Sequence, residues 1–511
     1  MRRHRQQYLR PAHVPCSVDA MSSARASISY AFAKRHGVVL LGSDTTAQIG
    51  LREGGDVQAL IELRRALGMP LQVRTLAPSV FDRHVSEIYA DAGLEQGVQV
   101  EALDLHGSLD SLIDDIPTAD LLDSQDDAPI IRLINGIIAE AARLGASDVH
   151  LESYESRLRV DGVMREAATL PGRIAPLLVS RVKVMARLDI AEKRIPQDGR
   201  VSLVMGAKAL DVRVSTLPTR GSERVVLRIL DKEQGTLSLA QLGMPPAVMH
   251  TVQRALQVPN GIVLVTGPTG SGKTTTLYAA LRLLNDGSRN ILTVEDPVEY
   301  AIDGVGQTQV NARVGMTFAA GLRAILRQDP DVVMIGEIRD TETAQIAVQA
   351  SLTGHLVLST VHTNDAVGAV TRLRDMGIEP FLLASSLRLI LAQRLVRRLC
   401  PQCRSERSID TGTRQLLDAP ADALIYTAVG CNVCHHSGYA GRVGIYEAIA
   451  VDDAMRRLIG DNADEDALAA VAFARVPRLG DAARAAVLQG LTTLEEALRV
   501  TRQQDDAHAA V

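Results

Sequence analysis

The stretch GPTGSGKTT has the residue types that bind the phosphates of a nucleotide. It satisfies the spacing G-x-x-x-x-G-K-[ST], with an apolar run before it and a helical pattern after it. Glycines let backbone N–H groups surround phosphate oxygens, the start of a helix adds partial positive charge, and Lys273 can reach the β- and γ-phosphates. Thr274 offers its hydroxyl to Mg²⁺. The predicted nucleotide-binding residues are Gly267, Pro268, Thr269, Gly270, Ser271, Gly272, Lys273, Thr274 and Thr275.

An acid follows a second apolar run, in DPDVVMIGEIRD. Residues 332–335 should form a buried strand that delivers Glu337 to its carboxyl end, where the ligands of parallel sheets bind. We predict that Glu337 is a Walker-B-type acid near Mg²⁺. The alternative is that an acid at this point caps the following helix.

The segment ILTVEDPVEY places three acids around a proline. Because Pro297 keeps Asp296 out of the helical region, the chain is expected to turn sharply here. With metal binding assigned to Glu337, Glu299 beyond the turn is predicted to orient or deprotonate the attacking water. Glu295 and Asp296 are predicted to fix the turn.

Four of the five cysteines form two C-x-x-C pairs, CPQC and CNVC, separated by a loop. This is the pattern of a closed structural zinc site, whose ligands would be Cys400, Cys403, Cys431 and Cys434. Zinc in comparable peptides contributes roughly 10–16 kcal/mol. The alternative is two pairs of free thiols. His435 and His436 are possible substitute ligands, but we expect them to be exposed. The flank QRLVRRLCPQCR is interpreted as a helix, exposed or facing another subunit, in preference to a surface for RNA or lipid headgroups.

Alternating strands and helices must position these groups. From Gly243 onward, the apolar runs GIVLVTG, NILTVED, DVVMIGE and HLVLSTV are separated by helical patterns. This order predicts a parallel sheet with helices on both faces. The region before it begins with an amphipathic helix that Gly145 should end, and continues with short strands and one more helix, which indicates an α+β domain.

The composition, 46% hydrophobic and 23% charged, is that of a globular protein. The net charge of -5 argues against non-specific nucleic-acid binding by the whole chain. No segment has the apolarity of a membrane span, and the basic N-terminus lacks the apolar run of a secretory signal. We expect a disordered tail (1–24), a small N-terminal domain (25–95) and an acidic linker (96–126) before the α+β domain.

These motifs together resemble the secretion ATPase family, which powers type II secretion, type IV pilus assembly and retraction, and type IV secretion. GPTGSGKTTTLYAAL, TVEDPVEY, DPDVVMIGEIRD and TGHLVLSTVHTN are similar to its Walker A, Asp box, Walker B and His box, and SYAFAKRHGVVLL resembles the N-terminal domain of its type II members. The resemblance implies an α/β fold. It comprises a docking domain, a PAS-like α+β domain (127–236) and a RecA-like P-loop ATPase domain (237–511) with a tetracysteine zinc subdomain (395–440).

The resemblance also implies roles within the ATPase domain. It places Lys273 and Thr274 on the nucleotide and Mg²⁺, and makes Glu299 the catalytic glutamate and Glu337 the Walker B acid. It further implies that His355 and His362 sense the state of the nucleotide. The alternative for each histidine is a side chain with satisfied hydrogen bonds at a strand end.

The resemblance also implies that two arginines of the α+β domain, which precedes the ATPase domain, contact the phosphates. Arg213 and Arg228 match the family's phosphate-contacting pair, so closure of the two domains would be part of catalysis. One departure is that the hairpin in SYESRLRVDGVMREA is about four residues shorter than the family usually has.

We therefore predict a cytoplasmic ATPase, peripheral to the inner membrane, that uses ATP, Mg²⁺ and Zn²⁺. By family resemblance it is a homo-oligomeric ring, with a hexamer expected, that drives pseudopilus assembly and the export of folded proteins by type II secretion. Inner-membrane platform proteins are the expected partners, one docking on the N-terminal domain, so membrane association is indirect; no nucleic acid is expected. The alternatives are a type IV pilus assembly ATPase, a DNA-moving ATPase and a nucleotide-gated scaffold that barely hydrolyses ATP.

Overall fold

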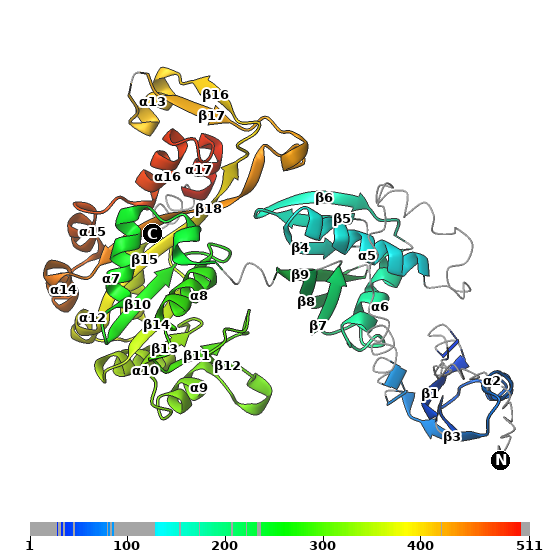
Figure 1. Ribbon diagram of the computed structural model, residues 1–511. Helices are drawn as coiled ribbons and strands as arrows, with labels where there is room; N and C mark the ends of the chain where they lie inside the picture. Colours follow the sequence, from blue (N-terminus) through cyan, green and yellow to red (C-terminus); the bar gives the residue numbers. More distant parts are fainter. Residues whose placement is uncertain are drawn as a thin grey trace, which may run out of the picture.

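The structure is a computed structural model (Figure 1). It describes residues 28, 32–33, 36–43, 46–78, 80–81, 84–85, 128–152, 155–172, 174–205, 208–220, 222–231, 237–420 and 422–501. The predicted tail (1–24) and acidic linker (96–126) lie outside the described residues. No helix in the described part of the chain is both long enough and apolar enough to cross a membrane.

The N-terminal region forms a small α/β unit. Strand β1 (Val38–Ser43) pairs antiparallel with β2 (Ala47–Arg52), and β2 pairs parallel with β3 (Leu71–Leu76). A parallel pair needs a crossover, and helix α2 (Ala59–Leu67) supplies it between β2 and β3.

The next unit is a sheet with two helices packed on it. The sheet is antiparallel throughout, in the order β6-β5-β4-β9-β8-β7. Helices α5 (Ala128–Arg143) and α6 (Ala175–Met185) contact each other and share one apolar core with it. The strands are β4 (Ala146–Leu151), β5 (Glu155–Val160), β6 (Val163–Thr169), β7 (Gln197–Met205), β8 (Lys208–Pro218) and β9 (Glu223–Asp231). The amphipathic helix, the short strands and the second helix expected from the sequence are therefore present.

The largest unit contains a sheet in the order β12-β11-β13-β14-β10-β15-β18, parallel except for β18. Its strands are β10 (Gly261–Thr266), β11 (Ile291–Glu295), β12 (Gly306–Gln309), β13 (Val332–Ile335), β14 (Leu356–Val361), β15 (Leu387–Leu399) and β18 (Tyr439–Ala450). Strands β10, β13 and β14 are buried along their whole length. Burial on both faces explains why their sequences are continuous apolar runs rather than alternating ones.

Helices cover both faces of this sheet (Figure 1). One face packs against α7 (Pro246–Leu256) and α8 (Lys273–Leu284). The other packs against α9 (Phe318–Ile325), α10 (Thr341–Leu352), α11 (Ala366–Asp375) and α12 (Pro380–Ser386). The same core extends to α14 (Asp453–Gly460), α15 (Glu465–Phe473), α16 (Leu479–Leu488) and α17 (Leu494–Thr501).

The flank QRLVRRLCPQCR corrects a sequence-based interpretation. It is not a helix: residues up to Leu399 belong to β15, which lies between β10 and β18. Val396, Leu399 and Cys400 are buried, and so are the polar residues Gln393 and Arg394. After β15 the chain forms a small outlying lobe from β16 (Ser405–Ser408), α13 (Thr411–Leu417) and β17 (Leu424–Thr427), which projects beyond α16 and α17 in Figure 1.

Candidate active site

The phosphate-binding loop joins the end of β10 to the start of α8. Lys273 occupies the first position of that helix, and its Nζ donates to the carbonyl oxygens of Gly267 at 2.7 Å and Pro268 at 3.1 Å. Gly267 and Gly272 have φ of 147° and 88°, a backbone conformation that side chains with a Cβ rarely adopt. Burial lowers the pKa of Lys273 to about 8. A bound polyphosphate would favour the protonated lysine.

Gln393 braces this loop from the neighbouring strand β15. Its Nε2 donates to the carbonyl oxygen of Ser271 at 2.7 Å, and its Oε1 accepts from the hydroxyl of Thr276 on α8 at 2.7 Å. A Cβ on Gly272 would lie 2.7 Å from the Gln393 amide nitrogen, so only glycine fits there without displacing it. Gln393 could not be predicted from the sequence, because its role depends on the pairing of β10 with β15.

A cavity of about 360 Å³ joins this loop to the predicted acids. The carboxyl ends of neighbouring parallel strands lie at one edge of the sheet, so residues that follow β10, β11, β13 and β14 meet there. Among the residues that line the cavity are Thr269, Gly270, Ser271, Gly272, Lys273, Thr274, Thr275, Glu295, Asp296, Glu299, Glu337, His362 and Arg228. The structure thus brings most of the predicted site residues together.

Glu337 projects from the end of β13 into this cavity. Its Oε2 lies 2.6 Å from Nε of Arg339 and 3.3 Å from Nε2 of His362. The helix cap that the sequence left as an alternative belongs to Asp340, whose carboxylate accepts from the backbone N–H of Thr343 at 2.8 Å. Burial, together with the nearby Lys273, lowers the pKa of His362, which favours a neutral imidazole next to Glu337.

Glu299 is held by an arginine of the preceding α+β unit. After β11 the chain turns through the cis peptide bond between Asp296 and Pro297. The Glu299 carboxylate then meets Arg213 of β8, with Oε2 at 2.8 Å from Nη2 and Oε1 at 3.3 Å from Nη1. The same Nη2 donates to the carbonyl oxygen of Val298 at 3.1 Å. A two-point contact of this kind fixes both the position and the orientation of the carboxylate.

Arg213 and Arg228 lie opposite each other on the paired strands β8 and β9. Residues directly opposite on neighbouring strands share one face of the sheet, so both arginines point the same way. Like charges in such a pair repel, and acids offset the repulsion: Glu299 pairs with Arg213, and Asp148 accepts from Nε of Arg228 at 2.9 Å. Arg228 is exposed and lines the cavity.

His355, predicted with His362 to sense the state of the nucleotide, is not among the described residues that line this cavity. It stands before β14, at the amino end, whereas the phosphate-binding loop follows the carboxyl end of the parallel strand β10. Its Nδ1 lies 2.9 Å from the carbonyl oxygen of Ala350 and 3.2 Å from the hydroxyl of Thr353. These contacts match the alternative of a satisfied histidine at a strand end.

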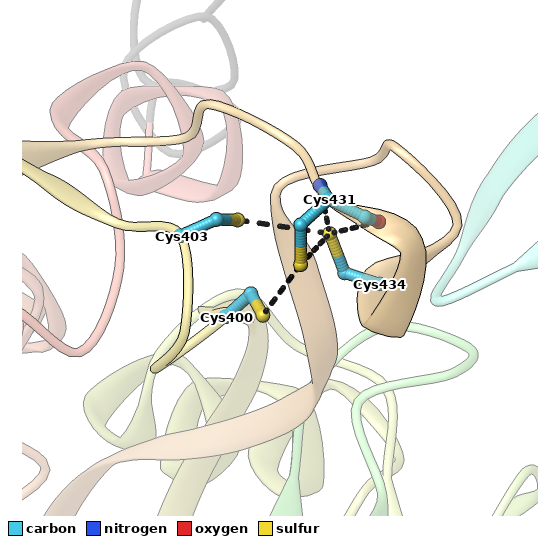
Figure 2. Close-up of side chains that lie close together, drawn as sticks. All are labelled: Cys400, Cys403, Cys431 and Cys434. Atoms are coloured by element: carbon cyan, nitrogen blue, oxygen red, sulfur yellow. Dashed lines mark hydrogen bonds between the residues drawn. The ribbon is translucent and has the colours of Figure 1, made fainter.

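The four cysteines face one another at the base of the outlying lobe (Figure 2). Cys400 and Cys403 follow β15, and Cys431 and Cys434 flank the turn that leads to β18. Three of their sulfur–sulfur distances are 3.7, 3.7 and 3.9 Å. These distances are too long for a disulfide bond. Tetrahedral zinc with Zn–S of about 2.3 Å requires sulfur atoms about 3.8 Å apart, so the cluster fits Zn²⁺.

Backbone donors also favour thiolates at this cluster. The N–H of Gly430 donates to Sγ of Cys403 at 3.3 Å, and the N–H of Gly438 donates to Sγ of Cys434 at 3.2 Å. His435 and His436 are exposed, as expected. His435 Nδ1 contacts Nη1 of Arg143 on α5 at 3.1 Å.

Most of the chain is similar in sequence to proteins of secretion systems. A family model described as "Type II/IV secretion system protein" matches residues 123–499, and a model of an N-terminal domain of "GSPII protein E" matches residues 27–89. The chain is 54% identical over 496 residues to the type II secretion system protein E of Pseudomonas aeruginosa, covering 95% of this chain and 98% of that protein. It is 52% identical over 488 residues to the type II secretion system ATPase E of Vibrio cholerae, covering 93% and 97%.

Solved structures are also similar to this one. The pilus retraction motor PilT with bound ADP has 29% sequence identity and a TM-score of 0.51, over 74% of this chain and 99% of that chain. The ATPase DotB of Legionella pneumophila has 20% identity and a TM-score of 0.56, over 73% and 96%, which indicates a shared fold.

Proposed function

Because this chain belongs to the family of type II/IV secretion system proteins, we propose that its cavity is the ATP-hydrolysing site of a type II secretion motor. The protein is an ATPase that drives pseudopilus assembly and the export of folded proteins. The observation that carries the proposal is the convergence of the phosphate-binding loop, Glu337 and Glu299 on one cavity. A site that only binds nucleotide would not need a second acid beyond the metal-binding one.

The residues of the cavity have different roles in phosphoryl transfer. Backbone N–H groups of the loop and Lys273 bind the β- and γ-phosphates. The Thr274 hydroxyl and the Glu337 carboxylate, two oxygen donors on the same cavity, would hold Mg²⁺, which neutralises phosphate charge when bound. Glu299 orients the attacking water and accepts its proton.

The arginines of the α+β unit complete the site. Arg213 and Arg228 share one face of their sheet, and Arg228 already lines the cavity. Charge on the transferred phosphoryl group spreads over its oxygens, and arginines from a second body stabilise it. In this mechanism the two units must approach each other for hydrolysis, as in other enzymes that close around a substrate. His362, in contact with Glu337, would respond to the loss of the γ-phosphate.

The remaining features concern the assembly. We propose that Cys400, Cys403, Cys431 and Cys434 hold a structural Zn²⁺ in the subdomain 395–440, on the support of their tetrahedral spacing. The proposed domains are a docking domain (25–95), an arginine-bearing domain (127–236) and the ATPase domain (237–511). The proposed assembly is a homo-oligomer, with six subunits by family analogy, on the cytoplasmic side of the inner membrane. A platform protein would dock on the N-terminal domain.

The alternatives receive less support. A type IV pilus assembly ATPase would use the same chemistry, but the N-terminal match at residues 27–89 is to a type II secretion domain. A DNA-moving ATPase is not favoured by the net charge of -5. A scaffold that barely hydrolyses ATP would have no use for Glu299 paired with an arginine.

The decisive experiment compares the wild type with Glu299→Gln. This variant keeps the shape of the side chain but cannot accept a proton, so it should bind ATP with wild-type affinity and lose about 10²-fold or more in hydrolysis rate. Glu342→Gln is the matched control, because Glu342 is an exposed acid of α10 that pairs with Arg323 away from the cavity. Wild-type turnover in Glu299→Gln would overturn the proposed role of Glu299.

A further inference from the structure

Tyr278 lies in α8, five positions after Lys273, and its side chain is buried inside the ATPase unit at 2% exposure. Its hydroxyl has three partners around the turn after β11, one of which is Nε2 of Gln307, which donates to it at 3.4 Å. It donates to Oε2 of Glu295, and it accepts from the backbone N–H of Glu299 at 3.1 Å. One oxygen atom therefore connects the helix that begins at the phosphate-binding loop with the residue assigned to the attacking water.

Glu295 is a buried carboxylate whose oxygens are occupied by side-chain donors. It is 3% exposed and ends strand β11. Besides Tyr278, it accepts from the hydroxyl of Thr293 at 2.6 Å and from Nε2 of Gln307 at 3.1 Å. A buried carboxylate that is this well satisfied is a rigid anchor, because moving it would leave a charge without compensation.

Gln307 of β12 extends the network along the same turn. Its Nε2 donates to the carbonyl oxygen of Tyr300 at 2.9 Å, and its Oε1 accepts from the backbone N–H of Ile302 at 2.8 Å. The ring of Tyr300 packs edge-on against that of Tyr278, with centroids 5.8 Å apart. Side chains from α8 and β12 thus hold the backbone from Glu299 to Ile302 at three points.

We propose that Tyr278 is a positioning residue for Glu299: its hydroxyl, oriented by Glu295, fixes the backbone from which the Glu299 carboxylate reaches the attacking water. The inference rests on the proposed role of Glu299 and adds Tyr278, which is not among the residues that line the cavity. A tyrosine suits the role because a single hydroxyl must donate to Glu295 and accept from Glu299 at the same time. Burial and the neighbouring carboxylate raise the pKa of Tyr278, which keeps the donated proton on its oxygen.

The expected effect falls on the chemical step. A displacement of about 1 Å at a catalytic group can cost about 10²-fold in rate. Tyr278→Phe removes only the hydroxyl, so we expect kcat to fall by about 10- to 100-fold while the KM for ATP changes by less than about twofold. Glu295→Gln should have a similar effect, since it disturbs the anchor that orients the hydroxyl.

The matched control is Tyr446→Phe. Tyr446 of β18 is also 2% exposed, and its hydroxyl donates to the carbonyl oxygen of Leu242 at 3.1 Å, away from Glu299. The same atom is lost from a buried tyrosine of the same unit, so this variant reports the general cost of removing a buried hydroxyl. Its kcat should stay within about twofold of wild type, with a melting temperature lowered as much as that of Tyr278→Phe.

A double variant separates positioning from a merely structural role. If Tyr278 acts through Glu299, Tyr278→Phe should not lower further the residual single-turnover rate of Glu299→Gln. The inference would be overturned if Tyr278→Phe lowered the rate of Glu299→Gln by the same factor as it lowers the wild-type rate. It would also be overturned if Tyr278→Phe had wild-type kcat, or if only its KM for ATP changed. If Tyr278→Phe does not fold, Glu295→Gln takes its place in the same comparison. Failure of the proposed function is distinguishable, because it would appear as wild-type turnover in Glu299→Gln itself.

Discussion

Glu447 on β18 should make the stability of the ATPase unit depend on pH, and Glu447→Gln should remove that dependence. The side chain is 1% exposed. Its Oε1 accepts from the backbone N–H of Ala366 at 2.9 Å and its Oε2 from that of Leu479 at 3.0 Å, so it joins the first residues of α11 and α16. Burial raises the pKa of Glu447 from 4.5 to about 7, helped by Asp365 and opposed by the two N–H groups and Arg478.

The sign and size of the effect follow from this pKa. The folded chain binds the Glu447 proton more tightly than the unfolded chain does, so the free energy of unfolding decreases as pH rises from 4.5 to about 7. The pKa difference corresponds to about 3 kcal/mol, of which about 2 kcal/mol falls between about pH 5.5 and pH 8.5. Glutamine is uncharged at every pH. Its amide nitrogen cannot accept from a backbone N–H, so one of the two hydrogen bonds is lost at a cost that does not vary with pH. Glu447→Gln should therefore gain about 2 kcal/mol on wild type across this range.

The assay is urea unfolding of wild type and variant at a series of pH values, with zinc present throughout. Circular dichroism is the suitable signal, because the chain contains no tryptophan. The difference between the two proteins isolates Glu447 from the other groups that titrate in this range. Glu406→Gln, an exposed acid of β16, should run parallel to wild type. A difference that is flat with pH, or a variant that becomes relatively less stable as pH rises, would refute the reasoning.

Two further predictions concern the arginine contact and the cysteine cluster. Arg213→Ala should lower kcat by about 10³-fold, the lower end of the range for arginine fingers, while ATP binding persists. Single-turnover hydrolysis measures the rate and nucleotide titration measures the affinity, and unchanged turnover would contradict the proposed role of Arg213. Cys431→Ser should lower the zinc content from about one ion per chain and lower the melting temperature of the lobe, as elemental analysis and calorimetry would detect. Val433→Ala, an exposed neighbour in the same turn, is the control, and equal zinc in both variants would count against the site.

The parts of the site that the sequence predicted are those encoded in local patterns. The phosphate-binding loop needs a strand, a glycine-rich turn and a helix in succession, and all three are contiguous in the chain. Glu337 and Glu299 each follow an apolar run, and parallel strands bring such strand ends to one edge. The alternating pattern therefore predicted both the parallel sheet and the convergence on its carboxyl edge.

The parts of the fold and of the site that could not be predicted from the sequence depend on pairing between distant segments. The flank QRLVRRLCPQCR was interpreted as a helix, whereas its first seven residues end β15, which is hydrogen-bonded to β10 along one edge and to β18 along the other. Gln393 and Tyr278 acquire their roles only from that pairing and from the packing of α8 on the sheet. The position of His355 at the amino end of β14, rather than the carboxyl end, is likewise visible only in the fold, because motif membership alone does not distinguish the two ends of a strand.

Glu299 is held from both sides of the boundary between the two units, and the two contacts have different consequences. Its backbone is held by Tyr278 within the ATPase unit, whereas its carboxylate is held by Arg213 of the α+β unit. If the units separate, the carboxylate loses its partner but its backbone position is kept. In the proposed mechanism the γ-phosphate would compete with Glu299 for Arg213, because both are anions and Arg228, on the same face of β8 and β9, lines the cavity. Transfer of Arg213 to the phosphate would free Glu299 for water at the moment when the charge of the transition state needs the arginine, so one movement of the α+β unit would accomplish both steps.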